Sequence, residues 1–582
     1  MSRRPADATI AARNRGDGAA LVTILTAAIL CIVAAVLVST DWWATFFAHP
    51  LVDASLTERG ARLWRALLVV SAIALPAALV STRALSPPAM LPGGASAAAT
   101  GRTRLFLITG LIVIGLLVRC TRLTESLWYD EIASWRTYNG GTRGAGAVLG
   151  AFLDPINHTF HTLLNRWSVQ WLVGQVGLEI AFRLSALLFS LAAIPVMFGL
   201  GRAVAGDRVG WIAATLAAIA PVCVLEGVEA RGYAQMIFFS AAATWLLIEG
   251  LCKGRPLLWM LYACCCALGV WSQFVTAWIA IGHGAWLAWR LFRDTEHRAR
   301  CAQGLIALAL AGVLTITLHA PLLPGLLAWR PNFAAQSSDQ PRILGPEGWH
   351  AILQLGGSWY WWAAMPGLMC VGIGIGSMLR RNQLASTHLI SPAQTLGLAM
   401  LGLPLMLVVV ALSGSWLYAR FMLFALPGAL LAMALGIDAI WSRRRVAGMV
   451  ALLALGAASA MDLSIRPAKQ PLRDAVEYVQ SHRQEGDRVV VVSLAHDVLS
   501  IYGLDLNIVD SFMLGRDLQQ KLDAVQPRWV IVEYPRRVAE DRHQLLLGRG
   551  YRAVERLPGW ADWGNGDVLV MERVGSPGRD GG

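Results

Sequence analysis

The chain has 582 residues, of which 56% are hydrophobic and only 15% are charged. Soluble globular proteins carry about 25% charged residues. The composition therefore excludes an ordinary soluble domain and indicates an integral membrane protein. The formal net charge of +12 is explained by Lys and Arg in short cytoplasmic loops. Nucleic-acid binding is not expected, because no compact basic domain with interleaved aromatic residues is present.

Long apolar runs follow one another along most of the chain. A bilayer core requires about 20 apolar residues per helix, and on this criterion the sequence predicts about thirteen transmembrane helices. They are expected at residues 20–40, 63–82, 104–119, 182–203, 209–226, 232–250, 256–273, 275–293, 303–323, 363–379, 395–413, 421–441 and 446–461. The first run has no clear cleavage site and is interpreted as an uncleaved signal anchor.

Basic residues between the runs predict the orientation. The Arg-rich N-terminal tail places the N-terminus in the cytoplasm, and every loop then expected inside is basic, as the positive-inside rule requires. These inside residues are Arg83, Arg102, Arg202, Arg208, Lys253, Arg255, Arg290, Arg293, Arg298, Arg300, Arg380, Arg381, Arg443, Arg444 and Arg445. An odd number of spans leaves the C-terminus outside the cytoplasm.

The composition changes after residue 461. Buried strands and amphipathic helices are predicted there, at residues 471–484, 487–492, 515–525, 528–534 and 567–574. Strands that alternate with helices indicate a small α/β domain. The predicted fold is thus a polytopic α-helical membrane protein with a small extracytoplasmic C-terminal α/β domain.

The stretch LWYDEIASW places two acids, Asp130 and Glu131, about ten residues beyond the end of an apolar run. An acid at the membrane surface can be a general base, a metal ligand or a solvated loop charge. Here Trp128, Tyr129 and Trp135 flank the pair. Aromatic neighbours partly remove water from a carboxylate, which makes it a better base. The sequence alone leaves the three alternatives open.

The segment DPINHTFHTLLNRW brings Asp154, Asn157, His158 and His161 within eight residues. Two histidines three residues apart share a helix face, and with Asp154 they could form a metal site. Alternatively, these side chains cap and line the start of an interfacial helix. The nine cysteines show neither metal-binding spacing nor a disulfide framework. No cofactor is predicted with certainty, and a divalent cation stays an alternative.

Two further turns on the outer side carry ionisable residues. EGVEARGY, residues 226–233, contains Glu229 and Arg231, which could equally form a local ion pair in a solvated turn. Arg420 begins an apolar helix on the outer side, where the positive-inside rule does not require it. It could bind a lipid phosphate or extend to the interface beside the helix.

Together these segments resemble the membrane-embedded C-class glycosyltransferases, in the bacterial protein-O-mannosyltransferase-like and aminoarabinose-transferase-like branch. The resemblance covers roughly residues 104–500. It is carried by LWYDEIASW, by D-x-x-N-H at 154–158, by the stretch 182–235 with its E-A-R-x-Y turn, by YARFMLFALPGALLAMALG at 418–436 and by PLRDAVEYV. Relatives often have His-Pro-Pro where this chain has His158-Thr159-Phe160.

The resemblance implies transfer of a sugar from a polyprenyl-phosphate donor to a hydroxyl of a lipid, glycan or protein acceptor, with inversion. It also implies a location in the bacterial plasma (inner) membrane. Asp130 would be the general base in a catalytic pair with Glu131, and Arg231 and Arg420 would bind the donor phosphate. The implied substrate-positioning residues, some of which could hold a divalent ion, are Asp154, Asn157, His158, Glu229, Tyr233 and Tyr418.

The implied organisation has three parts. Residues 1–103 form a cytoplasmic tail and two additional transmembrane helices. Residues 104–461 form the glycosyltransferase transmembrane domain, with a catalytic first outer loop at 120–181. Residues 462–582 form the extracytoplasmic α/β domain, for which we expect a role in docking the acceptor.

Two other functions are compatible with a polytopic chain of this kind. A transporter or flippase of lipid-linked sugars should place ionisable residues inside its spans, whereas the predicted spans are nearly free of Asp, Glu and Lys. An O-antigen-ligase-like enzyme with a diphosphate donor also uses arginines on the outer side. The ligase-like alternative is therefore the harder of the two to exclude from sequence.

Overall fold

The computed structural model describes residues 5–85, 101–142, 144–154, 157–336, 346–381, 391–413, 418–493, 498–502, 509–511, 517–561 and 565–574. The chain divides into two compact units. The first comprises Met1–Thr121, Thr142–Trp171 and Phe182–Leu463. The second comprises Arg122–Gly141, Leu172–Ala181 and Ser464–Gly582. The second unit thus combines two short segments from the region between α4 and α8 with the C-terminal residues.

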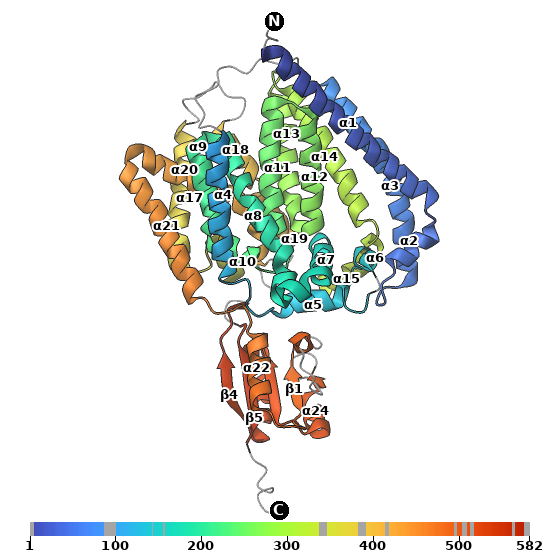
Figure 1. The fold of residues 1–582 in the computed structure, drawn as a ribbon, viewed down its shortest axis with the longest axis vertical. Helices are drawn as coiled ribbons and strands as arrows, with labels where there is room; N and C mark the ends of the chain where they lie inside the picture. The colour runs from blue at the N-terminus through green and yellow to red at the C-terminus, as the bar shows by residue number, and fades with distance from the viewer. Residues whose placement is uncertain are drawn as a thin grey trace, which may run out of the picture. The chain divides into compact units, whose positions relative to one another are not determined.

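The first unit is a helical bundle in which α11, α12 and α14 run side by side (Figure 1). The helices that lie wholly or mainly in it are α1 (Pro5–Leu37), α2 (Thr40–Phe47), α3 (Ala54–Ala84), α4 (Gly101–Cys120), α6 (Ala145–Gly150), α7 (Thr159–Val176), α8 (Leu178–Ala205), α9 (Asp207–Ile219), α10 (Pro221–Gly227), α11 (Tyr233–Lys253), α12 (Pro256–Ser272), η1 (Phe274–Thr276), α13 (Ala277–Arg293), α14 (Arg298–His319), α15 (Leu323–Gln336), α16 (Pro346–Leu355), α17 (Trp361–Arg381), α18 (Pro392–Met400), α19 (Gly402–Ser413), η2 (Ala419–Ala425), α20 (Leu426–Arg443) and α21 (Arg445–Ile465).

All thirteen predicted apolar runs are helical, but they do not all form straight spans of full length. Among the described residues, nine helices are long and apolar enough to cross a membrane, or up to eleven if each of two bent pairs is one span. The bent pairs are α1 with α2 and α9 with α10. The other two runs, α12 and α13, have 17 residues each. At 1.5 Å per residue such a helix is only about 25 Å long, which is why counting apolar runs gives a higher number.

Close backbone contact holds α17 against α20. A Cβ atom on Gly436 of α20 would overlap the carbonyl oxygen of Cys370, and one on Gly374 of α17 would overlap that of Ala432. Small residues at such crossings let helix backbones approach, which is a common basis of helix association inside membranes. Helix α20 is correspondingly enclosed, since 94% of its span is buried.

The C-terminal part of the second unit is an α/β domain, as the sequence predicts. Its five-stranded sheet has the order β2-β1-β3-β5-β4, with β1 parallel to β2 and β3, and β5 antiparallel to β3 and β4. The strands are β1 (Val489–Val492), β2 (Val509–Ser511), β3 (Trp529–Glu533), β4 (Tyr551–Leu557) and β5 (Val568–Arg573). The helices of the second unit are α5 (Tyr129–Tyr138), α22 (Leu472–His482), η3 (Leu499–Tyr502), α24 (Leu518–Val525), η4 (Pro535–Arg537) and α25 (Glu540–Gly548).

The three predicted strands correspond to β1, β3 and β5, whereas β2 and β4 are not predicted. Strands β1 and β3 are buried along their whole length, and such continuous apolar runs are characteristic of central parallel strands. Strand β4 is an edge strand with the sequence YRAVERL and several exposed positions. Charged residues are common on edge strands, where they prevent pairing with other chains. They also interrupt the pattern of apolar residues from which a strand is predicted.

The contact between α17 and α20 predicts an effect on stability. We expect Gly436→Ala to lower the thermal midpoint of the purified protein, because overpacking costs about 1–3 kcal/mol. The matched control is Gly372→Ala on α17, where an added Cβ meets nothing within 4 Å and Ala favours the helix. Equal midpoints for the two variants would contradict the close approach of the two backbones.

Candidate functional site

A bent pair of helices leads into the first group of predicted site residues. Helices α9 and α10 meet at an angle of 55°, with Pro221 as the first residue of α10. The chain then turns through residues 228–232 before α11 begins at Tyr233. Two predicted residues of this turn, Glu229 and Arg231, are buried. The turn is therefore part of the protein interior, not the solvated surface loop that was one of the two sequence interpretations.

A buried arginine that sequence reasoning missed secures the bend. Arg119, from α4, is fully buried, and its Nη1 donates to the carbonyl of Ala218 at 2.9 Å. Its Nη2 donates to Ala217 and Cys223 at 3.2 Å each, and its Nε donates to the Ser190 hydroxyl at 2.7 Å. The carbonyl groups at a helix C-terminus have no partner within the helix, so Arg119 caps α9 where the span breaks. The one signal for Arg119 in the sequence is its place at the end of an apolar run, and Arg420 likewise stands at the start of one.

His158 lies against the turn that carries Arg231. Its Nδ1 accepts the backbone N–H of Gly232 at 2.7 Å, and its Nε2 lies 2.9 Å from the side-chain amide of Gln273. Because Nδ1 accepts, the neutral ring carries its proton on Nε2. The imidazole also contacts the Tyr233 ring edge-on at 5.1 Å. His158 is thus held rigidly in one tautomer.

Two guanidinium groups lie near the ring of Tyr233. The Cζ atoms of Arg231 and Arg420 lie 6.0 and 5.9 Å from the centroid of this ring. Arg420 is also 4.9 Å from the ring of Tyr418. The structure therefore brings together five residues that the sequence singled out from three distant segments. We call His158, Arg231, Tyr233, Tyr418 and Arg420 the arginine cluster.

The electrostatics of the cluster keep the histidines neutral. Burial lowers the pKa of His158 well below its ordinary value, and its electrostatic interactions with Arg231, His161 and Arg420 lower it further. Burial, with Arg231, lowers the pKa of His161 to about 3. The Nδ1 of His161 lies 3.1 Å from the Ser185 hydroxyl and 3.0 Å from the Gln235 amide. The positive charge of the cluster is therefore carried by its arginines, and the imidazole rings beside them are neutral.

The other residues of the 154–161 segment have structural contacts. Asn157 is buried, donates to the carbonyl of Ala151 at 3.3 Å and accepts the hydroxyl of Thr162 at 3.1 Å, which fixes the chain before α7. Asp154 is partly buried. Within the described parts of the chain, no group of three or more His, Cys, Asp or Glu residues could hold a metal ion. Both ring nitrogens of His158 already have protein partners, which leaves it no position for a metal.

The acid pair lies in the second unit, and its two members differ. Glu131 is 1% exposed, and its Oε2 accepts the backbone N–H of Trp128 at 3.0 Å. This is the helix-capping role of an acid at the third position of a helix. Asp130, one residue earlier, is only partly buried. The structure therefore gives the pair separate surroundings and assigns Glu131 a structural contact that the sequence motif alone does not reveal.

The chain is a multi-pass helical protein with a small C-terminal α/β domain, and its fold resembles that of the membrane-embedded C-class glycosyltransferases. The chain is similar to ArnT from Cupriavidus metallidurans, in a structure bound to undecaprenyl phosphate (TM-score 0.50, 15% identity) and in the apo state (TM-score 0.53, 14% identity). Each comparison covers 82% of this chain and 99% of ArnT. A weaker similarity, with a TM-score of 0.48 and 10% identity over 74% of this chain and 70% of the other, is to the archaeal oligosaccharyltransferase AglB from Archaeoglobus fulgidus. No protein-family model and no curated protein matches the sequence.

The capping contact of Glu131 predicts how its substitutions behave. Glu131→Gln retains a side-chain oxygen for the Trp128 N–H, so we expect stability close to that of the wild type. Glu131→Ala loses the contact and should destabilise the second unit by about 1 kcal/mol. Thermal unfolding of both purified variants measures this difference. If Glu131→Gln were as destabilised as Glu131→Ala, the capping role would be wrong.

The buried histidines predict a loss of stability in acid. An unfolded histidine takes up a proton near pH 6.5, whereas His161 stays neutral in the folded protein down to about pH 3. The unfolded state therefore binds more protons below about pH 6.5. As the pH is lowered, the free energy of unfolding decreases by up to about 1.4 kcal/mol per pH unit for each such histidine. We expect His161→Asn to flatten the dependence of the thermal midpoint on pH between 7.5 and 5.5. His482→Gln, at an exposed histidine, is the control.

Proposed function

We propose that the chain is an integral membrane glycosyltransferase that moves a sugar from a polyprenyl-phosphate donor to an acceptor hydroxyl on the extracytoplasmic side. The observation that carries the proposal is the arginine cluster within this fold. ArnT, which has the same fold, is described in complex with undecaprenyl phosphate. Arginine is the side chain best suited to a phosphate, because its planar guanidinium group donates several hydrogen bonds and stays charged.

The donor phosphate binds to Arg231 and Arg420. The bond that breaks joins the anomeric carbon to the phosphate oxygen, and negative charge on the departing lipid phosphate grows as it breaks. Two fixed guanidinium groups stabilise that charge with little rearrangement. Because the leaving phosphate is a weak base, no general acid is needed, which agrees with His158 being held neutral. His158, Tyr233 and Tyr418 position the two arginines and the donor.

Asp130 is the general base, because Glu131 is occupied by the helix cap and Asp130 is the more exposed of the two. It removes the proton from the acceptor hydroxyl as the oxygen attacks the anomeric carbon on the face opposite the phosphate. Attack from that face inverts the anomeric configuration. Asp154, Asn157 and Glu229 complete the substrate-positioning set.

We further propose the bacterial plasma (inner) membrane as the location, with a cytoplasmic N-terminus and the C-terminal α/β domain outside. In that orientation the acceptor is a lipid, a glycan or a protein of the cell envelope. The three-part organisation with boundaries at residues 103 and 461 belongs to the same proposal. It assigns the two first spans to an addition that precedes the glycosyltransferase domain.

Release of free polyprenyl phosphate tests the proposal. Purified protein is incubated with a panel of polyprenyl-phosphate sugars and an extract containing candidate acceptors. We expect the wild type to release the lipid phosphate, and Asp130→Asn to do so about 10²–10⁴ times more slowly with unchanged donor binding. Arg420→Gln should weaken donor binding about 10-fold or more, since hydrogen bonds to charged groups contribute about 1.5–3 kcal/mol.

Two exposed residues of the C-terminal domain supply matched controls, Asp541→Asn and Arg552→Gln. Both should behave as the wild type. Full activity of Asp130→Asn would refute its role as the base. Release from a polyprenyl-diphosphate panel, with none from any monophosphate donor, would instead support the ligase-like alternative.

A further inference from the structure

The N-terminus of α5 is held by side chains at three consecutive backbone amides. The N–H of Leu127 donates to the Tyr502 hydroxyl at 2.6 Å, and the N–H of Tyr129 donates to Oε1 of Gln470 at 3.0 Å. Between them, the N–H of Trp128 donates to Glu131. The first amides of a helix have no acceptor within the helix. Here they are satisfied directly before Asp130, and two of the three acceptors belong to the C-terminal residues.

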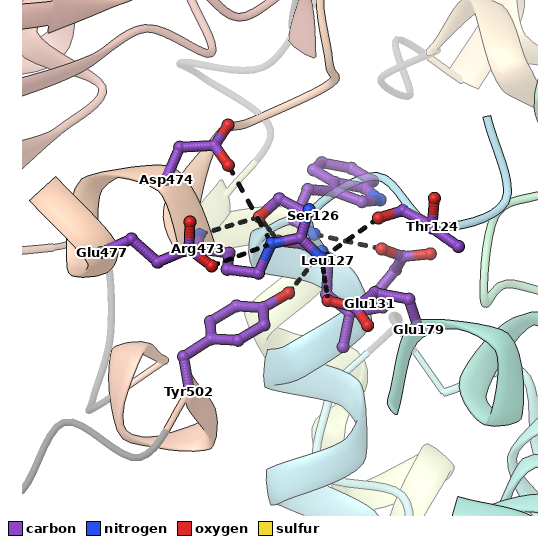
Figure 2. A network of polar contacts seen from close by, with 10 residues as sticks. Thr124, Ser126, Leu127, Glu131, Glu179, Arg473, Asp474, Glu477 and Tyr502 are labelled. Carbon is purple, nitrogen blue, oxygen red and sulfur yellow. Dashed lines mark hydrogen bonds and ion pairs between the residues drawn. The ribbon is translucent and has the colours of Figure 1, made fainter. Parts of the chain in front are cut away.

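Arg473, from the C-terminal residues, makes further contacts with the residues that precede Leu127. The backbone N–H of Arg473 donates to the Ser126 hydroxyl at 3.0 Å, and its guanidinium group bonds the carbonyl of Thr124 at 3.2 Å and Glu179 at 2.8 Å. Figure 2 shows Arg473 at the centre of this network, with Tyr502 and Glu131 close to Leu127. Residues 124–129 are thus bonded along their length to residues 470–502.

The aromatic side chains beside Asp130 are fixed by the same region. The Lys469 ammonium lies 3.8 Å from the ring centroid of Trp128, a close cation–π contact, and Trp128 is 2% exposed. Tyr129 contacts the ring of Tyr534 edge-on at 6.2 Å. Both residues that precede Asp130 are therefore constrained in backbone and in side chain.

We propose that Gln470 and Tyr502 are positioning residues for Asp130. The inference rests on the proposed function, in which Asp130 is the base, and it gives the C-terminal domain a role in the chemical step besides acceptor docking. A base must be placed within hydrogen-bond distance of the proton that it removes. Loss of either acceptor frees an amide within three residues of Asp130, and displacement of a catalytic group by about 1 Å can cost about 10²-fold in rate.

Four variants of the full-length enzyme test the proposal. We expect Gln470→Leu and Tyr502→Phe each to lower kcat about 10-fold while the donor KM changes less than twofold. Gln470→Glu keeps an oxygen acceptor for the Tyr129 N–H and should restore most of kcat. The control, Tyr551→Phe, removes a hydroxyl of the same domain that donates to the carbonyl of Pro527 at 2.6 Å, and its kcat should equal that of the wild type.

Hydrogen–deuterium exchange supplies a readout that does not depend on activity. We expect faster exchange of the peptide containing residues 127–131 in Gln470→Leu and Tyr502→Phe, and no change in Tyr551→Phe. Unchanged kcat in Gln470→Leu, with Asp130→Asn inactive, would overturn the inference and leave the proposed function intact. An equal loss of kcat in Tyr551→Phe would also overturn it, because the effect would then be general destabilisation. Full activity of Asp130→Asn would remove the proposed base and this inference with it.

Discussion

The turn that follows α9 depends on the buried guanidinium group of Arg119, which binds the last carbonyls of that helix. Its acceptors are the Ser190 hydroxyl and the carbonyls of Gly115, Ala217, Ala218 and Cys223. Burying a charge is costly unless its hydrogen bonds are satisfied. The negative end of the α9 dipole and its free carbonyls meet that requirement. The same bonds stabilise the bend between α9 and α10, where the last carbonyls of α9 would otherwise lack partners.

The bend after α9 determines where α10 and the following turn lie. Helix α10 is short, and the chain leaves it at Gly227, where a side chain would overlap Ser190 and crowd Arg119. The next turn carries Glu229, Arg231 and Gly232 into the interior. The N–H of Gly232 then fixes the ring of His158. The segment that links Arg119 to the arginine cluster is therefore fixed at both of its ends, at Gly227 and at Gly232. Electrostatic stabilisation of a departing phosphate requires rigid placement of the charged groups.

The sequence indicates the residue types of the site but not its supports. Arg231, Arg420 and His158 are noticeable as polar residues beside apolar runs, whereas Tyr233 and Tyr418 are named only through the resemblance to a known family. That these five residues meet could not be seen in the sequence. Glu131 and Arg119 could not be assigned, because a cap and a buried carbonyl-binding arginine depend on contacts with Trp128 and with α9. The contacts of Gln470 and Tyr502 join positions more than 340 residues apart, and no local pattern encodes them. Strand β4 was missed for a different reason, since its charges are those of an edge strand.

The candidate catalytic residues are divided between two separately packed units. Asp130 belongs to the unit that contains the α/β domain, and Arg231 and Arg420 belong to the helical bundle. In the second unit, Gln470 and Tyr502 bind the backbone directly before Asp130. In the first unit, the ring of Tyr233 lies near both Arg231 and Arg420. Changes that loosen the α/β domain should therefore affect the proton-transfer step, whereas changes that loosen the bundle should affect binding of the donor phosphate. In the enzyme that we propose, the α/β domain therefore supports the base, and the helical bundle supports the arginines that bind the phosphate.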